Sequence, residues 1–255
     1  MSIPNLSLAG EVAIVTGSRR GIGKTIALAF AQAGADVAVC DIVIDDGQLV
    51  SVAEEIQRLG RRSLAIQVNT SKKKDVDNLV QKIVDQFGVI DILVNNAGII
   101  IKSPLLDMPE NDWDKLMSVD LKGYFLCSQA VGKRMIKQKK GKMINIASQY
   151  AFKVTPGMGV YSIAKAGVVM LTRVLAQELG SYGIRANTIA PCLVRTEFSR
   201  PNWSDPEFLK QVEASIPLGR VAETDDLVGA ALFLASEASS FITGHTILVD
   251  GGTLA

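Results

Sequence analysis

The sequence predicts an α/β fold, a single doubly wound domain in which helices cover both faces of a mostly parallel sheet. Short apolar, β-branched runs alternate with longer stretches of helical periodicity, as in strands joined by helical crossovers. The 255 residues are 48% hydrophobic, enough to bury a substantial core, and α/β chains of this length often form one domain. No linker, repeat or low-complexity tract interrupts the pattern, so we expect one domain over residues 1–255.

Strands and helices are expected in alternation along the chain. The strand candidates are short apolar runs at residues 12–15, 37–40, 63–68, 92–95, 142–147, 184–189 and 246–249. Helical periodicity covers residues 23–32, 46–59, 73–87, 110–137, 161–179 and 224–235. Gly88 and Gly180 directly follow two of these helices, where glycine commonly ends a helix. Residues 160–179 carry apolar side chains on more than one helical face, which predicts burial all round.

Residues 191–217 form the least regular stretch of the chain. In open α/β sheets the ligand crevice lies outside the carboxyl ends of the strands, where this segment begins. We therefore expect a substrate loop here that could close as a lid. The other interpretation is a surface insertion without a role in binding.

Charge and cysteine content argue against several classes of function. The 27 basic and 26 acidic residues leave a net charge of +1, which favours neither nucleic acid nor a membrane surface as a partner. Cys40, Cys127 and Cys192 are odd in number and lack C-x-x-C spacing, and His245 is the only histidine, so we expect no disulfide framework and no metal site. Residues 1–8 lack the features of a signal peptide, and no stretch approaches a membrane span. We expect a soluble cytoplasmic protein.

A glycine-rich loop follows the first predicted strand. Gly17, Gly21 and Gly23 stand where the strand turns into a helix. Glycine lets the backbone turn tightly and approach a pyrophosphate, and the helix N-terminus offers unpaired N–H groups with a partial positive charge. This placement predicts a nucleotide-binding loop.

Asp41 follows the second predicted strand, eighteen residues after Gly23. A carboxylate there can accept hydrogen bonds from an adenosine ribose, which favours NAD. Arg20 in the glycine loop could instead favour the 2′-phosphate of NADP. At about 4 Å and an effective dielectric near 20, like charges cost roughly 4 kcal/mol, so Asp41 should repel that phosphate unless Arg20 compensates. We expect NAD; a simple strand-end cap at Asp41 would leave the preference open.

Tyr161 and Lys165 are four residues apart, and Ser148 precedes the tyrosine by thirteen. On a helix a spacing of four places both side chains on one face, so that the ammonium can make the phenol easier to deprotonate. The pair is a candidate proton-transfer site, although this spacing also arises by chance in surface helices.

In combination, the glycine loop, the Asn95–Gly98 run and the Ser148, Tyr161 and Lys165 trio resemble the short-chain dehydrogenase/reductase family (SDR). The resemblance covers essentially the whole chain, including Pro191, Thr196 and the final run from residue 243 to 252. It implies a Rossmann-like domain with a seven-stranded sheet and a homotetramer. It also implies a tyrosine that exchanges a proton with the substrate oxygen while hydride passes to or from nicotinamide.

The resemblance further implies roles for individual residues. Tyr161 would be the general acid/base, Ser148 would hydrogen-bond the substrate oxygen, and Lys165 would lower the phenol's pKa and hold the nicotinamide ribose. An unperturbed phenol, with a pKa of about 10, is a poor base at neutral pH. Cofactor contacts are implied for Gly17, Arg20, Gly21, Ile22, Gly23, Asp41, Asn69, Asn95, Ala97, Gly98, Tyr161, Lys165, Pro191, Val194 and Thr196. Substrate contacts are expected for Ser148, Gln149, Tyr161, Cys192, Phe198 and Trp203.

Three residues depart from the family pattern. Asn69 stands in place of an aspartate near the adenine and can still accept its hydrogen bond. Cys192 replaces the glycine that usually follows Pro191, where it could alter the room for substrate. Asp120 replaces a catalytic asparagine that anchors a proton-relay water. The relay could survive this change, or the carboxylate could oppose the effect of Lys165 on Tyr161 and shift the pH optimum upward.

These observations favour an NAD-dependent oxidoreductase that interconverts a secondary alcohol and a ketone. The mixture of polar and aromatic residues Gln149, Tyr150, Arg195, Arg200 and Trp203 suits a sugar, polyol or hydroxy acid slightly better than a steroid. One alternative is an NADPH-dependent ketoacyl or carbonyl reductase. Another is a nucleotide-binding sensor or scaffold whose chemistry is impaired at Asp120.

Overall fold

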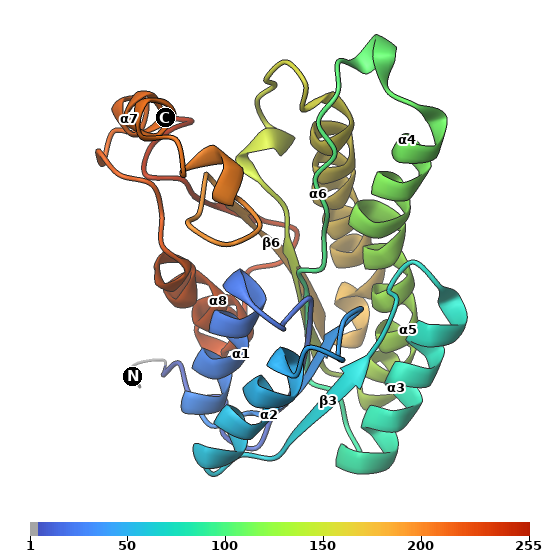
Figure 1. Ribbon diagram of the computed structural model, residues 1–255. Coiled ribbons are helices and arrows are strands. Elements are labelled where there is room, and N and C mark those ends of the chain that lie inside the picture. The colour runs from blue at the N-terminus through green and yellow to red at the C-terminus, as the bar shows by residue number, and fades with distance from the viewer. Residues whose placement is uncertain (1–4) are drawn as a thin grey trace.

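A seven-stranded parallel sheet forms the centre of the protein, in the strand order β3-β2-β1-β4-β5-β6-β7 (Figure 1). The computed structural model describes residues 5–255, without the side chain of Asn202. Every residue of β1 is buried, as expected for a parallel strand covered on both faces. The strands are β1 Val12–Thr16, β2 Asp36–Asp41, β3 Ser63–Gln67, β4 Ile92–Asn95, β5 Gly141–Ile146, β6 Ile184–Pro191 and β7 Thr246–Val249.

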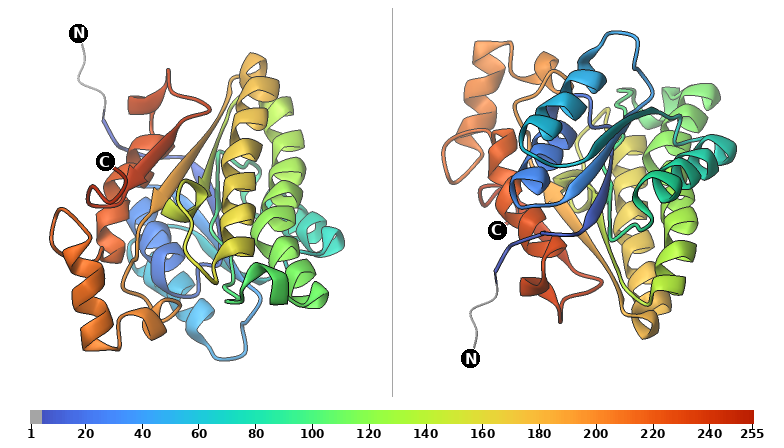
Figure 2. Two further views of the ribbon diagram at one scale, coloured as in Figure 1. Left: turned by 90° about the horizontal axis from the view of Figure 1, so that it is seen from above. Right: turned by 90° about the horizontal axis from the view of Figure 1, so that it is seen from below.

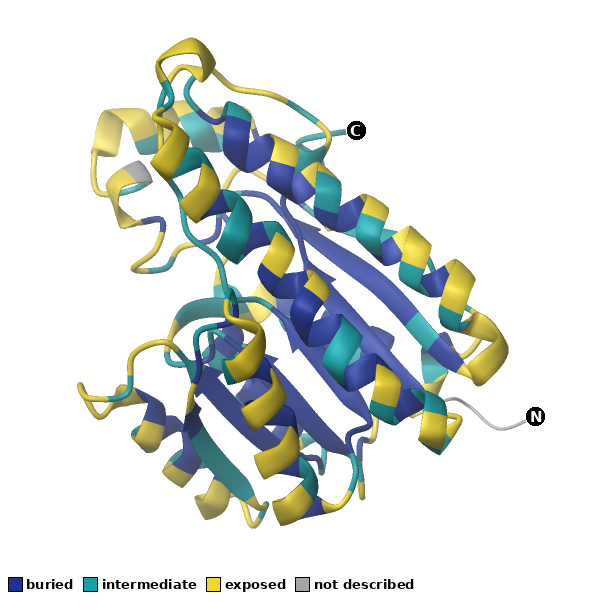
Figure 3. Ribbon diagram, turned by 90° about the vertical axis from the view of Figure 1, so that its right-hand side faces the viewer, coloured by how far each residue is buried: buried dark blue, intermediate teal, exposed yellow. Residues whose placement is uncertain are grey.

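Helices pack on both faces of the sheet, which confirms the predicted Rossmann-like fold (Figure 2). One core lies between the sheet and α1, α2 and α8, with Phe30 and Ile56 fully buried. The other lies beneath α3, α5 and α6, with Ile83 and Met135 fully buried. Figure 3 views this second layer, over the dark blue strands. The helices are α1 Gly21–Gln32, α2 Gln48–Arg58, α3 Lys73–Phe87, α4 Glu110–Met117, α5 Gly123–Gln138, α6 Gly159–Leu179, α7 Pro206–Ala214 and α8 Val228–Ala235.

The expected helix over residues 110–137 is interrupted. α4 ends at Met117, a π-helical turn covers Ser118–Lys122, and α5 begins at Gly123. Such turns often occur at functional sites, and this one carries Asp120, which is completely buried.

The irregular segment 191–217 contains a short helix, α7, that the periodicity did not reveal. Asp205 caps it, its carboxylate accepting from the N–H groups of Glu207 and Phe208, and Pro206 occupies the first turn. No residue of α7 is buried. The helix is therefore specified by its N-terminal start signal rather than by an apolar stripe.

α6 corrects two sequence expectations. Ile163, Met170 and Val174 are exposed, so the helix is not buried all round. Residues 159–182 are also long and apolar enough to span a membrane by length and composition, with a mean hydropathy of 1.3. Half of the most apolar stretch of these residues is buried inside the protein, as in a core helix of an α/β domain. Of the N-terminal segment read as lacking a signal peptide, residues 1–4 lie outside the described chain.

Both expected glycine stops lie at the ends of their helices, but they differ. Gly88 adopts a left-handed φ of 84° and donates its N–H to the carbonyl of Val84. Gly180 keeps a right-handed conformation and opens a 3₁₀ turn, and the left-handed residue is Gly183, with a φ of 73°.

Candidate active site

A cavity of about 920 Å³ opens at the carboxyl ends of the strands. The loops after β1, β2, β4, β5 and β6 line it, together with the start of α6 and part of α7. This is where ligands bind in open α/β sheets, and the volume is within the range of small-molecule sites. The cavity therefore brings the glycine loop and the Ser148, Tyr161 and Lys165 trio to one place.

The glycine loop is packed too tightly for side chains. Gly17 and Gly21 have left-handed φ values of 64° and 57° and both line the cavity. A Cβ at Gly17 would lie 2.8 Å from the Cα of Ala97. Gly23 does not line the cavity, because it packs inward, where a Cβ would lie 2.4 Å from the carbonyl oxygen of Gly17. Gly23 therefore shapes the loop, and a direct cofactor contact of this residue stays a prediction.

Asp41 is paired with an arginine that the sequence reading did not single out. Arg19 Nε lies 3.7 Å from Asp41 Oδ1, and the guanidinium also bonds Asp46. Arg20 lines the cavity but is exposed. Adjacent loop residues face different ways, and the sequence alone does not show which of the two arginines meets the carboxylate.

Asn95, for which a cofactor contact was expected, and its neighbour Asn96 make different contacts. Asn95 is buried away from the cavity, where its Nδ2 donates to Ser128 Oγ and Asn145 Oδ1 at 3.1 and 2.8 Å. Asn96 lines the cavity, and its Nδ2 donates to the carbonyls of Thr16 and Gly17 at 3.0 Å each. The strand-end asparagine thus supports the sheet, and its neighbour supports the glycine loop.

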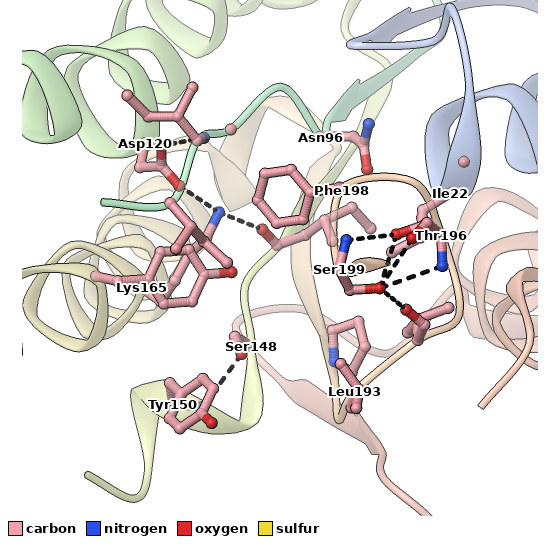
Figure 4. Close-up of a pocket in the computed structure, with 18 of the residues that line it drawn as sticks. Ile22, Asn96, Asp120, Ser148, Tyr150, Lys165, Leu193, Thr196, Phe198 and Ser199 are labelled. Carbon is pink, nitrogen blue, oxygen red and sulfur yellow. Dashed lines mark hydrogen bonds and ion pairs between the residues drawn. The ribbon is translucent and has the colours of Figure 1, made fainter. Parts of the chain in front are cut away.

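Lys165 is held by three oxygen atoms. Its Nζ lies 3.2 Å from Tyr124 Oη, 3.2 Å from the carbonyl of Ile146 and 3.3 Å from Asp120 Oδ2. Figure 4 shows Lys165 beside Asp120 on the wall that also carries Ser148. The first two contacts are hydrogen bonds, whereas the contact with Asp120 is an ion pair without hydrogen-bond geometry. Because an ammonium has three N–H donors, one of them remains for a ligand hydroxyl.

Tyr124 was also missed by the sequence reading. Its hydroxyl donates to the Ile146 carbonyl at 2.9 Å, and burial raises its pKa well above the ordinary value, so it stays protonated. It is a neutral support for Lys165. It lies four residues after Asp120, at the helical spacing that would have been the only sequence signal for it.

Burial raises the pKa of Tyr161 to about 12. Lys165 and a hydrogen bond with Ser148 lower this pKa, while Asp120 and Tyr124 raise it. The Lys165 ammonium lies 5.6 Å from the centre of the Tyr161 ring. The expectation of a lowered phenol pKa is therefore only half met: the lysine acts in the expected direction, but desolvation outweighs it.

Asp120 is locked in place by two contacts. Its Oδ1 accepts from the N–H of Ile99 at 2.8 Å, and its Oδ2 faces Lys165. Burial raises the pKa of this carboxyl, although Lys165 and the Ile99 N–H oppose the shift. The expected proximity of Asp120 to Lys165 is confirmed by this geometry.

The substrate side is formed by the loops after β5 and β6. Gln149, Cys192 and Phe198 line it, and Tyr150 meets the Tyr161 ring edge-on at 6.2 Å between centroids. Burial raises the pKa of the Cys192 thiol, as for an inert apolar filler.

Trp203 does not line the cavity. Its Nε1 donates to the Thr196 carbonyl and to Ser199 Oγ at 3.0 and 3.1 Å, so it braces the loop from behind. The expected substrate contact of Trp203 stays a prediction, and the structure gives this residue a supporting role in the loop. The other expected residues that line the cavity are Ile22, Asn69, Ala97, Gly98, Pro191, Val194 and Thr196.

Comparisons with known proteins agree with this geometry. The family model described as enoyl-(acyl carrier protein) reductase matches residues 17–253. Subunit BbsD of a hydroxy(phenyl)methylsuccinyl-CoA dehydrogenase from Thauera aromatica is 43% identical, covering 97% of this chain and 98% of the relative. The 2-dehydro-3-deoxy-D-gluconate 5-dehydrogenase of Escherichia coli is 39% identical over the full length of both chains.

A solved structure shows the same fold. The gluconate 5-dehydrogenase from Burkholderia cenocepacia, in complex with NADP and tartrate, superposes with a TM-score of 0.93 at 37% identity, covering 97% of this chain and 96% of that one. The family match, the full-length relatives and the position of Ser148, Tyr161 and Lys165 on one cavity wall lead to one conclusion. The chain belongs to the short-chain dehydrogenase/reductase family, whose members are oxidoreductases that bind a nicotinamide cofactor.

Proposed function

We propose that this protein is an NAD-dependent oxidoreductase that interconverts a secondary alcohol and a ketone, with Tyr161 as general acid/base. The observation that carries the proposal is the single cavity that joins the glycine loop to Ser148, Tyr161 and Lys165. A sugar, polyol or hydroxy acid is the favoured substrate class, supported by polar Gln149 beside Ser148 and by relatives named for gluconate derivatives.

The residues present fit a dinucleotide. Gly17 and Gly21 leave a cradle that a Cβ would obstruct, and Gly21 and Ile22, the first residues of α1, line the cavity, where a helix N-terminus favours an anion. Asn69 and Ala97 line the same end. A bound nicotinamide would supply the hydride acceptor or donor, and the protein's own residues would position the alcohol and carry its proton.

Our preference for NAD rests on Asp41. Arg19 is neutralised by Asp41 and Asp46, so it offers little net charge to a 2′-phosphate. Arg20 remains as an exposed cation near the cavity. At about 4 Å and an effective dielectric near 20, an unpaired carboxylate would oppose each unit of phosphate charge by roughly 4 kcal/mol, and the ion pair of Asp41 with Arg19 reduces this opposition.

The proton steps follow from the three side chains. In oxidation, Ser148 Oγ holds the alcohol oxygen and Tyr161 Oη takes its proton; in reduction, Tyr161 returns that proton to the carbonyl oxygen. Because burial raises the Tyr161 pKa to about 12, the phenol is mainly protonated at neutral pH. Reduction is therefore supported near neutrality, and oxidation should speed up with rising pH.

A second candidate is an NADPH-dependent ketoacyl or carbonyl reductase. The family model's acyl-carrier description and the NADP in three solved relatives favour it, together with Arg20. Comparing kcat/KM with NADH and NADPH decides between the two. An Asp41→Ala variant that gains NADP-linked activity would identify Asp41 as the discriminating group, whereas a wild-type preference for NADP would refute our choice.

Turnover is tested by a spectrophotometric screen of alcohols with NAD, in which reduced cofactor absorbs. Tyr161→Phe should lower oxidation by at least about a hundredfold, because the proton acceptor is lost. Fluorescence of bound NADH checks that the variant still binds cofactor. Binding without turnover of any alcohol or ketone by the wild type would favour the sensor or scaffold alternative, and full activity of the variant would refute the role of Tyr161.

We also propose a homotetramer of single-domain subunits spanning residues 1–255, in the cytoplasm. Phe125 on α5 and Ile163, Met170 and Val174 on α6 are exposed apolar side chains, as at subunit contacts. The three cysteines are free and buried, which suits a reducing compartment. Sedimentation equilibrium tests the tetramer; a monomer at micromolar concentration would contradict it.

A further inference from the structure

The substrate side of the cavity carries a lysine without an ionic partner. Lys153 follows the short 3₁₀ turn Gln149–Ala151 and lines the same cavity as Ser148 and Tyr161. The backbone N–H of Lys153 donates to the backbone carbonyl of Gln149 at 3.1 Å, so residues 149 and 153 belong to one turn of the chain. Within the described chain, no carboxylate lies in ion-pair distance of its ammonium.

The acidic residues on the cavity wall are all engaged elsewhere. Asp41 pairs with Arg19 and Asp120 with Lys165, while Glu197 lies 3.2 Å from Arg200. These side chains therefore do not neutralise Lys153, and its charge is available to a ligand.

The arginines expected near the crevice do not compete with Lys153 for an anion. Arg195 pairs with Glu223 at 3.2 Å and stacks on Trp203, and Arg200 is tied to Glu197. Neither arginine lines the cavity, whereas Lys102, after β4, does. In the turn that follows Ser148, the cationic residue that lines the cavity is Lys153.

Gln149 supplies an independent observation. The residue is only 7% exposed, it lines the cavity, and its Oε1 has no hydrogen-bond partner in the described structure. A buried amide oxygen without a donor is costly, and it can be satisfied by the hydroxyl of a bound molecule. The turn thus presents one acceptor for a hydroxyl and one cation for an anion, directly after the serine of the catalytic trio.

We propose that the substrate is a hydroxylated carboxylate, held at its carboxylate by Lys153 and at a neighbouring hydroxyl by Gln149. The inference rests on the proposed alcohol dehydrogenase function and names the chemical class of its substrate. Lys153 acts in binding and specificity, and the proton and hydride steps remain with Ser148, Tyr161 and the cofactor.

The test compares acids with matched neutral alcohols. Hydroxy acids of three to six carbons, such as D-gluconate, are assayed beside the polyols of the same length and configuration, such as D-glucitol. The wild type should oxidise at least one acid with a kcat/KM about tenfold or more above that of its polyol, as expected when a charged hydrogen bond is made. If every acid is equal to or poorer than its polyol, the inference is overturned while the proposed function stands.

Variants locate the effect. Lys153→Gln should raise KM for the preferred acid by about tenfold or more, with little change in kcat and none in KM for the polyol; Lys153→Arg should retain the preference. Lys210→Gln, which removes an exposed charge on α7 away from the cavity wall, should leave both KM values unchanged. Equal losses on acid and polyol in Lys153→Gln would refute the carboxylate contact.

The Gln149 contact has its own readout. Gln149→Leu should raise KM for acid and polyol alike, because both offer the hydroxyl, and unchanged KM values would refute this contact. Calorimetric titration with D-gluconate and D-glucitol gives a reading separate from turnover. A wild type that turns over no alcohol or ketone with either cofactor would instead overturn the proposed function itself.

Discussion

Replacing Asp120 with asparagine should move the pH profile of alcohol oxidation downward. Asp120 Oδ2 lies 3.3 Å from Lys165 Nζ, which is 5.6 Å from the centre of the Tyr161 ring. The carboxylate is thus at most about 9 Å from the ring. At that separation and an effective dielectric near 20, removing its charge changes the free energy of ionising the phenol by about 2 kcal/mol, or slightly more than one pKa unit.

The sign follows from the role of Tyr161 as a base. The negative charge of Asp120 raises the Tyr161 pKa, so its removal lowers that pKa from about 12. Oxidation needs the ionised phenol, and its alkaline rise should therefore shift down by about one pH unit. At a fixed pH below the pKa, kcat/KM should increase about tenfold. Asparagine can keep the bond from the Ile99 N–H, because its amide oxygen can replace Oδ1.

The assay is kcat/KM for oxidation of a confirmed substrate, measured from about pH 7 to about pH 11. Asp114→Asn, an exposed change on α4 outside the cavity, is the matched control and should leave the profile in place. An unchanged or upward-shifted profile in Asp120→Asn, with cofactor binding intact, would refute the electrostatic reasoning. A loss of activity at every pH would show that Asp120 supports the proton relay instead.

Two further predictions concern stability. Gly23→Ala should lower the free energy of unfolding by about 1–3 kcal/mol, because the added Cβ would crowd the carbonyl of Gly17. The control Gly229→Ala in α8, where the added Cβ would meet no atom within 4 Å, should be neutral or stabilising. Equal urea midpoints for the two variants would contradict this prediction. Asp36→Asn should cost about 1–3 kcal/mol at neutral pH, because the carboxylate accepts from the backbone and side chain of Arg62. Burial raises the pKa of Asp36, but the hydrogen bonds from Arg62 outweigh burial, and the net pKa is lowered. The stability lost in Asp36→Asn should therefore shrink as the pH falls below about 3.8, where the wild-type carboxylate begins to be protonated. An equal loss of stability at acidic and neutral pH would count against this prediction.

Most of the fold could be predicted because parallel strands buried on both faces leave continuous apolar runs in the sequence. All seven expected strands form, with ends within two residues of the expectation. Ser148, Tyr161 and Lys165 could be found because the helical spacing of the last two occurs together with the other motifs of one family, and all three line the cavity. The spacing alone was not enough, because it also arises by chance.

The remaining features depend on contacts that a linear pattern does not record. The π-helical turn at Asp120 is a change of hydrogen-bond register inside an otherwise helical stretch. The direction of side chains at loop ends decides that Arg19 rather than Arg20 pairs with Asp41. It also decides that Asn96 rather than Asn95 binds the end of β1 and the glycine loop. The raised pKa of Tyr161 comes from burial by distant segments, which opposes the local effect of the lysine.

The Asn96 side chain has a further consequence for how the cavity can move. It joins the loop after β4 to the loop after β1, and Thr16 Oγ1 accepts in return from the N–H groups of Asn96 and Ala97. These hydrogen bonds hold the two loops together, so neither loop can shift toward a ligand without the other. Residues of the 191–217 segment also line the cavity, and its α7 has no buried side chain to hold it, so we expect movement around a ligand there rather than in the two tied loops.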